Sequence, residues 1–272
     1  MRSSYMKKFA VALCVLAFAG AWLFLTNTAE SKCVNPDENR NLFTSAVKGD
    51  QVALATLEKK SAAGDFCAKD YLGGVYARGE KKAEGERLEK EAFAEYQAAA
   101  EKGDPEAQAF IGSYILYQGE YKDKAKATEL IRKAANQGNK EAMFNVGRLY
   151  DGIGRFYFGP KWKDNDLATA ADWYMTAAKK GYQPSYKFLA DMYAEGEGVP
   201  QNWHNAYFWG CLSTECFAAE PPQWEAALCM GCVPSRIYSD PLEAKKHLDK
   251  SDIETIKKQA SEWKPGMTPP ME

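Results

Sequence analysis

Four cysteines in the last third of the chain have a spacing that could do chemistry. They follow the pattern C-x4-C-x12-C-x2-C and are Cys211, Cys216, Cys229 and Cys232. The last two stand in "CMGC", the C-x-x-C arrangement of thiol–disulfide redox pairs, in which a thiolate attacks a substrate disulfide. His204 and His247 are the only imidazoles that could assist. One hypothesis is therefore a redox enzyme that uses Cys229 and Cys232.

The same spacing also resembles a zinc module with four thiolate ligands. Two histidines are too few for a multi-histidine metal centre. Redox pairs usually stand in a βαβ context, and the sequence predicts no such unit. The choice among redox chemistry, zinc and structural disulfides depends on the compartment that the chain reaches.

The N-terminus predicts export. The start "MRSSYMKK" is basic and has no acid, and an apolar run follows from Phe9 to Leu25. This pattern is typical of a signal peptide, cleaved after Ala21 or Ala29, and also of a retained inner-membrane anchor. Both alternatives stay open, and in either case the rest of the chain crosses the membrane. We expect a periplasmic protein, either free or anchored by residues 9–25.

Export favours disulfides for the six cysteines that follow the apolar run. Their clustering pairs Cys33 with Cys67. The late four then pair among themselves in one of three ways. Among these ways we expect Cys211–Cys232 together with Cys216–Cys229.

A repeat supplies the elements that must position these residues. A glycine recurs at Gly64, Gly103, Gly138 and Gly181. Four residues later stands a small residue, namely Ala68, Ala107, Ala142 or Ser185. Four further on stands an aliphatic residue, namely Leu72, Ile111, Val146 or Leu189. The next step of four gives Tyr76, Ile115, Tyr150 and Tyr193. The last three glycines follow the double alanines Ala99–Ala100, Ala134–Ala135 and Ala177–Ala178.

Steps of four place these side chains on one stripe of a helix. The glycine ends one helix in the left-handed conformation, and the alanines let neighbouring helices approach closely. The stretch "GEGVPQ" at Gly196–Gln201 supplies a turn inside a unit. The glycines are 39, 35 and 43 residues apart, a period typical of stacked helical hairpins. The pattern predicts an all-α protein, a right-handed solenoid of helix-turn-helix repeats.

The pattern resembles the Sel-one-like repeat family, short relatives of the tetratricopeptide repeat. The resemblance rests on "AEKGDPEAQAFIG", "ANQGNKEAMFNVGRLYDG" and "AKKGYQPSYKFLADMYAEGEGVPQNWHNAYFW" and spans about Gly64 to Trp209. The chain departs from the pattern at Ile115, which replaces the tyrosine, and in the expanded turn "DGIGRFYFGPKWKDND". The resemblance implies an adaptor that holds other proteins. Exported bacterial members are implicated in envelope assembly, host interaction and neutralising secreted toxins.

The domain boundaries follow from these segments. We expect a signal or anchor at 1–29, N-terminal helices that form a degenerate repeat at 30–63, and the repeats at 64–210. Capping helices with the late cysteines follow at 211–264. The proline-rich tail 265–272 is predicted to be disordered.

The long turn of the third unit is the feature that stacking explains least. It holds Arg155, Phe156, Tyr157, Phe158 and Trp162. Aromatic residues and arginine gathered on a loop are typical of a protein-binding hot spot, so these five are the candidate partner-binding residues. The alternative is that they fold back onto the adjacent hairpin. By contrast, we expect Trp203, Tyr207, Phe208 and Trp209 to be core residues of a repeat helix.

The motifs of common enzymes are absent from the sequence. It has no glycine-rich phosphate loop and no G-x-S-x-G elbow. The net charge of −2 gives no electrostatic footprint for nucleic acid. We therefore predict a non-enzymatic scaffold of the bacterial envelope that binds a protein or peptide without a cofactor or metal. A specific form of this hypothesis is an immunity protein against a secreted toxin, and the redox enzyme is the alternative.

Overall fold

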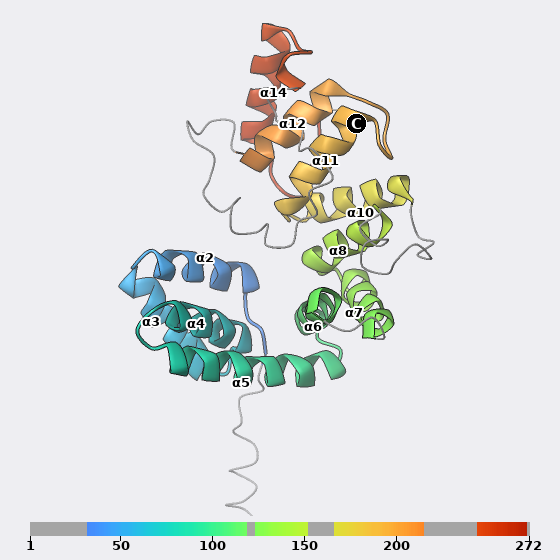
Figure 1. The fold of residues 1–272 in the computed structure, drawn as a ribbon. Helices are drawn as coiled ribbons and strands as arrows, with labels where there is room; N and C mark the ends of the chain where they lie inside the picture. Colours follow the sequence, from blue (N-terminus) through green and yellow to red (C-terminus); the bar gives the residue numbers. More distant parts are fainter. Residues whose placement is uncertain (1–31, 119–122, 152–165, 215–243, 271–272) are drawn as a thin grey trace, which may run out of the picture. The chain divides into compact units, whose positions relative to one another are not determined.

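The computed structural model describes residues 32–118, 123–151, 166–214 and 244–270 (Figure 1). Apart from a single bridge between Lys32 and Asp65, these residues form only helices, turns and connecting segments. The chain divides into two compact units, Met1–Lys102 and Gly103–Glu272. The predicted all-α class of helix-turn-helix repeats is confirmed.

The first unit contains four helices, coloured blue to teal in Figure 1. They are α2 (Pro36–Val47), α3 (Gln51–Ala62), α4 (Phe66–Arg78) and α5 (Lys82–Glu101). The helix pair expected in residues 30–63 is α2 and α3, and both of these helices pack on α4. The helix α4 begins directly after the first repeat glycine, Gly64, and packs along α5 as the first complete hairpin.

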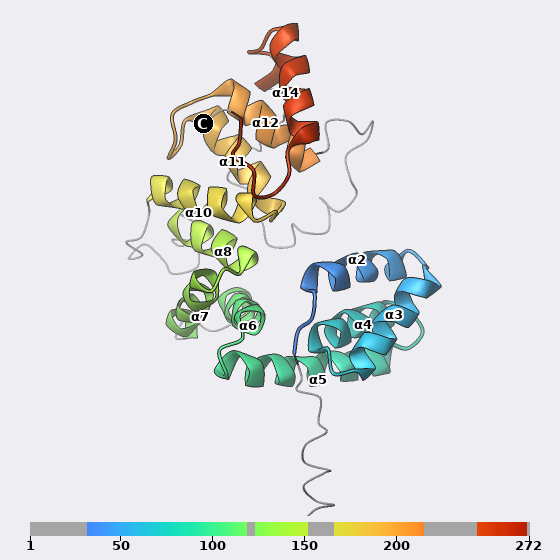
Figure 2. The same cartoon turned by 180° about the vertical axis from the view of Figure 1, so that it is seen from behind.

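The second unit continues with three further hairpins and a closing helix. They are α6 (Pro105–Gln118) with α7 (Lys124–Asn136), α8 (Lys140–Tyr150) with α10 (Leu167–Lys179), and α11 (Pro184–Glu195) with α12 (Trp203–Thr214). Each hairpin contacts the next, since α7 packs on α8 and α10 packs on α11. The closing helix α14 (Lys250–Glu262) packs on α12. Figure 2 shows the same succession from behind.

The turns that precede the first helix of each repeat share one local conformation. The repeat glycines Gly64, Gly103, Gly138 and Gly181 have φ angles of 88°, 96°, 95° and 79°, the left-handed conformation that glycine adopts without steric cost. At Gly138, the backbone N–H groups of Gly138 and Asn139 donate to the carbonyls of Ala135 and Ala134. The double alanine thus supplies the carbonyls that close the preceding helix. The residue after each of the first three glycines caps the next helix through its side chain: Asp65, Asp104 and Asn139.

The predicted stripe of the glycine-led helices is confirmed by burial. The small residue four positions after the glycine is fully buried in all four repeats, with 0% exposure for Ala68, Ala107, Ala142 and Ser185. The aliphatic residue four positions further on is also buried in each repeat. The residue a further four positions along the helix is half-buried. The stripe is therefore the buried face of each glycine-led helix, as the spacing predicts.

A second small position, one residue after the aliphatic one, was not singled out from the sequence. It is occupied by Gly73, Gly112, Gly147 and Ala190. A Cβ added to Gly112 would lie 2.7 Å from Ile131 Cγ1, and one added to Gly147 would lie 2.6 Å from Tyr174 Cε1. The missing side chain lets the second helix of the hairpin cross at close range. Glycine here is a packing residue rather than a turn residue.

The predicted Cys33–Cys67 disulfide is confirmed, with a Cα–Cα distance of 5.1 Å. It ties the segment before α2 to the first turn of α4. Neighbouring hydrogen bonds hold the same junction: the Asn39 side chain donates to Val34 O and to Asp65 Oδ2, both at 3.0 Å. The Asp65 carboxylate lies beside both sulfurs. Sulfurs joined in a disulfide do not offer thiolate ligands to a metal.

The C-terminal segment corrects one prediction. Disorder was expected for residues 265–272 because they are rich in proline, and this is wrong for residues 265–270. The Gly266 N–H donates to Lys179 O at 2.7 Å, and Pro269 is buried. We call residues 263–270 the C-terminal strap. A single anchoring tryptophan, Trp263, and a glycine with a φ angle of 92° at position 266 hold it in place.

None of the helices within the described ranges is both long enough and apolar enough to cross a membrane. The predicted signal or anchor, residues 1–29, lies outside the residues that the structure describes.

Candidate functional site

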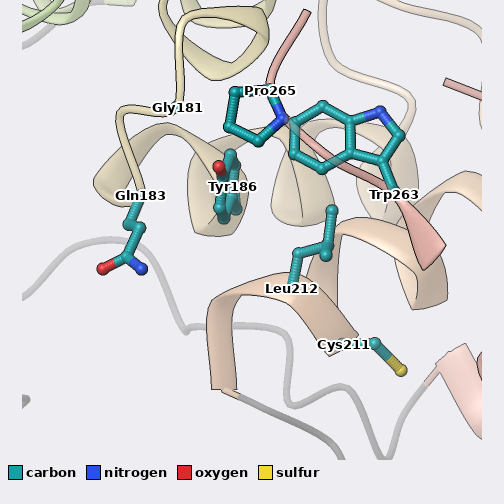
Figure 3. A pocket seen from close by; sticks show the side chains of 7 residues that line it. All are labelled: Gly181, Gln183, Tyr186, Cys211, Leu212, Trp263 and Pro265. Atoms are coloured by element: carbon teal, nitrogen blue, oxygen red, sulfur yellow. The ribbon is translucent and has the colours of Figure 1, made fainter. Parts of the chain in front are cut away.

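A pocket of about 300 Å³ opens at the last repeat of the second unit, between α11, α12 and the strap (Figure 3). Its lining residues are Gly181, Gln183, Tyr186, Cys211, Leu212, Trp263 and Pro265. Leu212 points toward the Trp263 ring in Figure 3, whereas the Cys211 sulfur points away from Gly181. We call this site the terminal pocket. It is the candidate site that the described residues form.

The turn at Gly181 shapes one wall of the terminal pocket. Gly181 adopts a φ angle of 79° and ends α10, and Pro184 then occupies the first turn of α11, where its missing N–H costs nothing. A Cβ added to Gly181 would lie 2.9 Å from Pro265 Cγ. The proline of the strap can therefore rest on the turn only because residue 181 is glycine.

Aromatic rings form the floor of the site. Trp263 lies edge-on to Tyr186, Trp209 and Phe208, with ring-centroid distances of 5.8, 5.6 and 6.3 Å. Trp209 and Phe208 are fully buried, which confirms their prediction as core residues. Edge-to-face pairs of this kind each add about 1 kcal/mol beyond the area that they bury. Burial raises the pKa of Tyr186 to about 12, so its hydroxyl stays neutral at physiological pH.

The polar groups of the terminal pocket suit binding rather than covalent chemistry. Gln183 offers an amide and Tyr186 a neutral hydroxyl, and both can donate or accept hydrogen bonds. Cys211 is disulfide-bonded, so it offers no nucleophilic thiolate. A pocket with apolar walls and a few convergent polar groups is the usual form of a ligand site.

Several sequence-predicted site residues lie outside the described part of the chain. These are the loop residues Arg155, Phe156, Tyr157, Phe158 and Trp162, and the cysteines Cys216, Cys229 and Cys232. The partner-binding loop, the late disulfide pairing and the redox pair therefore stay predictions. The structure does show that Cys211 is disulfide-bonded and buried.

The two histidines lie at the contact between α12 and the C-terminal segment. The His204 Nε2 atom is 3.2 Å from Asp252 Oδ2, and the His247 ring stacks on Trp203 at a centroid distance of 3.9 Å. Both therefore join the closing helix to the last repeat. Trp203 is half-buried by this stacking rather than fully buried, whereas Tyr207 is buried as predicted.

Asp70, a carboxyl group in the first unit, has a raised pKa. Burial, and secondarily the charge of Glu89, raises the pKa of Asp70 to about 6. Asp70 lies on α4 and Glu89 on α5. Two carboxylates can divide acid and base roles in catalysis. Burial between two packed helices is the simpler cause of this shift, and we assign the pair no catalytic role.

The terminal pocket was not predicted from the sequence, because the residues that line it come from distant parts of the chain. Tyr186 reads as an ordinary helix residue, and Trp263 precedes a tail rich in proline and glycine. The usable signal was the order of residues at the end of the chain: an aromatic residue, then proline and glycine, directly after an amphipathic helix. That order is typical of a chain that turns back onto its own fold.

The fold defines a class, that of helical-repeat proteins built from glycine-led hairpins. No family model matches the chain. A crystal structure of a protective antigen from uropathogenic Escherichia coli strains, described as displaying an SLR fold, is similar with a TM-score of 0.51 and 26% identity. The similarity covers 77% of this chain and 40% of that chain. Together with the repeat positions, this likeness shows that the chain has the fold of Sel-one-like repeat proteins.

Three further similarities differ in extent. A Sel1 repeat protein from Oxalobacter formigenes has a TM-score of 0.41 and 26% identity, over 70% of this chain and 73% of its own. An immunity protein from Pseudomonas aeruginosa has a TM-score of 0.43 and 18% identity, over 82% of this chain and 83% of its own. In sequence, 70 residues are 31% identical to the ERAD-associated E3 ubiquitin-protein ligase component HRD3A of Arabidopsis thaliana. That match spans 26% of this chain and only 9% of the plant protein.

Proposed function

We propose that this chain is an exported, non-enzymatic scaffold of the bacterial cell envelope that binds a protein or peptide partner on its repeat surface. The observation that carries the proposal is the terminal pocket, an aromatic site at the end of a stack of repeats. Helical-repeat proteins commonly use such surfaces to hold extended partners. The pocket offers ring edges and hydrogen-bonding groups but no free thiol.

Export is supported by two observations of different kinds. The chain begins with a basic and then an apolar segment. The described cysteines Cys33, Cys67 and Cys211 are all disulfide-bonded. Disulfides persist in oxidising compartments such as the periplasm. Residues 9–25 are either a signal that is removed or an inner-membrane anchor.

The partner-binding loop is the second element of the proposal. Arg155, Phe156, Tyr157, Phe158 and Trp162 combine the residue types that dominate protein interfaces. We expect this loop to supply specificity, since its sequence departs from the repeat pattern that packing fixes.

Affinity capture from the envelope tests this function. The tagged chain is expressed in its own host, and co-purifying proteins are identified together with the oxidation state of each cysteine. A stoichiometric partner, lost when Phe156, Tyr157, Phe158 and Trp162 are changed to alanine while helical content is kept, supports the scaffold. If the captured partner is a secreted toxin, the immunity role is supported as well.

The same experiment distinguishes the redox alternative. A redox enzyme would yield no stoichiometric partner but mixed disulfides trapped on Cys229 or Cys232. It would also show one reactive thiol in "CMGC". That outcome would replace the scaffold proposal.

A further inference from the structure

We propose that the terminal pocket is part of the peptide-binding site of this scaffold and that the C-terminal strap, which forms one wall of the pocket, occupies the rest of that site in the absence of a partner. The partner would present a segment of the same chemistry as the strap: an aromatic side chain followed closely by a proline–glycine turn. This inference rests on the proposed scaffold function and names the kind of partner that one surface binds.

The strap shows which groups the site recognises. The Trp263 ring enters the aromatic floor, where only 8% of the residue stays exposed. Pro265 rests on Gly181, at a place where any Cβ would clash. The Gly266 N–H donates to the carbonyl of Lys179 at 2.7 Å. An apolar side chain, a proline and one main-chain hydrogen bond are the contacts that extended peptides use on protein grooves.

The repeat explains why this surface needs an occupant. At two glycine turns of the second unit, the residue that precedes the next repeat glycine approaches the turn: the Gln137 side chain donates to Gly103 O at 3.2 Å, and a Cβ on Gly138 would lie 3.5 Å from Lys180 Nζ. After the last hairpin, the strap covers the equivalent turn at Gly181 instead. It therefore covers a surface that is built to receive another segment of chain.

The strap can leave without the closing helix. The helix α14 has its own anchors, because Ile253, Ile256 and Ala260 are buried and Asp252 pairs with His204. By contrast, the strap is buried only at Trp263 and Pro269, and residues 264–268 between them are exposed. The terminal pocket also stays open beside the strap, so an incoming peptide has room to bind before the strap is displaced.

A peptide in trans competes with a strap that has a high effective concentration. Gly266→Val weakens this competitor without touching the pocket. Its left-handed φ of 92° disfavours a β-branched residue, although no atom lies within 4 Å of the added Cβ. Thr268→Ala, at an exposed position of the same strap, is the matched control.

The test uses a fluorescein-labelled peptide with the sequence of residues 262–269, titrated into the oxidised full-length chain and followed by anisotropy. We expect about tenfold tighter binding to Gly266→Val than to the wild type or to Thr268→Ala, because a left-handed L-residue costs about 1–2 kcal/mol. A peptide in which the tryptophan is replaced by alanine should not bind. Equal or absent binding to all three folded proteins overturns the proposal and makes the strap a fixed cap.

If Gly266→Val does not fold, hydrogen exchange in the wild type decides the question. Excess peptide should speed exchange of the Gly266 amide, since displacement breaks its bond to Lys179. Unchanged exchange at saturating peptide contradicts the proposal. Failure here leaves the scaffold function intact, because envelope capture tests that function without the peptide.

Discussion

Changing Gly147 to alanine should destabilise the second unit, even though alanine usually stabilises a helix interior by about 1 kcal/mol relative to glycine. The new Cβ would lie 2.6 and 2.7 Å from Cε1 and Cδ1 of Tyr174, far inside the normal contact distance of about 3.5–4.0 Å. Tyr174 is fully buried, and its hydroxyl donates to the Asp151 carboxylate, which is also buried. The ring therefore cannot turn away freely.

The expected size follows from these opposing effects. Overpacking a buried site costs about 1–3 kcal/mol. A ring pushed off its partner also loses a buried hydrogen bond worth about 1–3 kcal/mol. Subtracting the helix gain of about 1 kcal/mol leaves a net loss of about 3 kcal/mol in the free energy of unfolding for Gly147→Ala.

Urea unfolding followed by tryptophan fluorescence measures this loss. All tryptophans other than Trp22 lie in the second unit, so the signal reports on the unit that contains Gly147. With a slope of about 2 kcal/mol/M, the midpoint should fall by about 1.5 M. Ala190→Gly, at the same repeat position, should cost only about 1 kcal/mol through lost helix propensity and a small cavity.

The stabilities of Gly147→Ala and Ala190→Gly together test whether α8 and α10 cross at close range. If Gly147→Ala is as stable as the wild type or more stable, α8 and α10 do not cross at the distance described, and glycine at this position has another cause. Gly103→Ala separates packing from backbone strain. Its Cβ would meet nothing within 4 Å, so its cost of about 1–2 kcal/mol comes from the left-handed conformation alone.

Three further changes test other features. Cys33→Ser removes the disulfide to Cys67 and should lower the free energy of unfolding of the first unit by about 4 kcal/mol. This is the loop-closure value for two cysteines 34 residues apart in the sequence. Urea unfolding under oxidising conditions measures it. Burial and Glu89 raise the pKa of Asp70 from 3.8 to about 6, so its contribution to stability is full below pH 4 and is lost as pH rises through 6. Asp70→Asn should therefore match the wild type at pH 4 and exceed it by about 2 kcal/mol at pH 7.5, and equal curves at both pH values would contradict the shift. Ser185→Ala should raise stability by about 1 kcal/mol, because this hydroxyl is buried without a hydrogen-bond partner, and a loss would mean that it has one.

The repeat made the framework predictable from sequence. Steps of four between Gly138, Ala142, Val146 and Tyr150 depend only on helix geometry, and the left-handed glycine depends only on local sterics. The Cys33–Cys67 pair was predictable because the other cysteines cluster far along the chain. The close crossing at Gly147 was not, since it depends on how deeply Tyr174 enters the partner helix.

The strap escaped prediction for a tertiary reason. Proline, glycine and a polar tail predict disorder when only local composition is considered. Trp263 reverses that outcome because a complementary site, formed by Tyr186 and Trp209, exists 54 to 77 residues earlier in the chain. No local pattern reveals such a site. Burial of a single ring contributes about 2–3 kcal/mol toward ordering the short segment that follows, together with the Gly266 hydrogen bond and the burial of Pro269.

Function in this chain is therefore expected where the repeat is interrupted. At regular positions such as Ala142 and Val146, packing fixes the residue type, so those positions cannot vary to suit a partner. The predicted partner-binding loop lies outside the described residues, and the strap does not follow the repeat pattern. The strap covers the turn at Gly181, and a segment that binds in this way can be replaced by another segment with the same groups. The end of the stack thus combines a requirement for an occupant with freedom in its identity, which is the physical basis for placing the peptide site there.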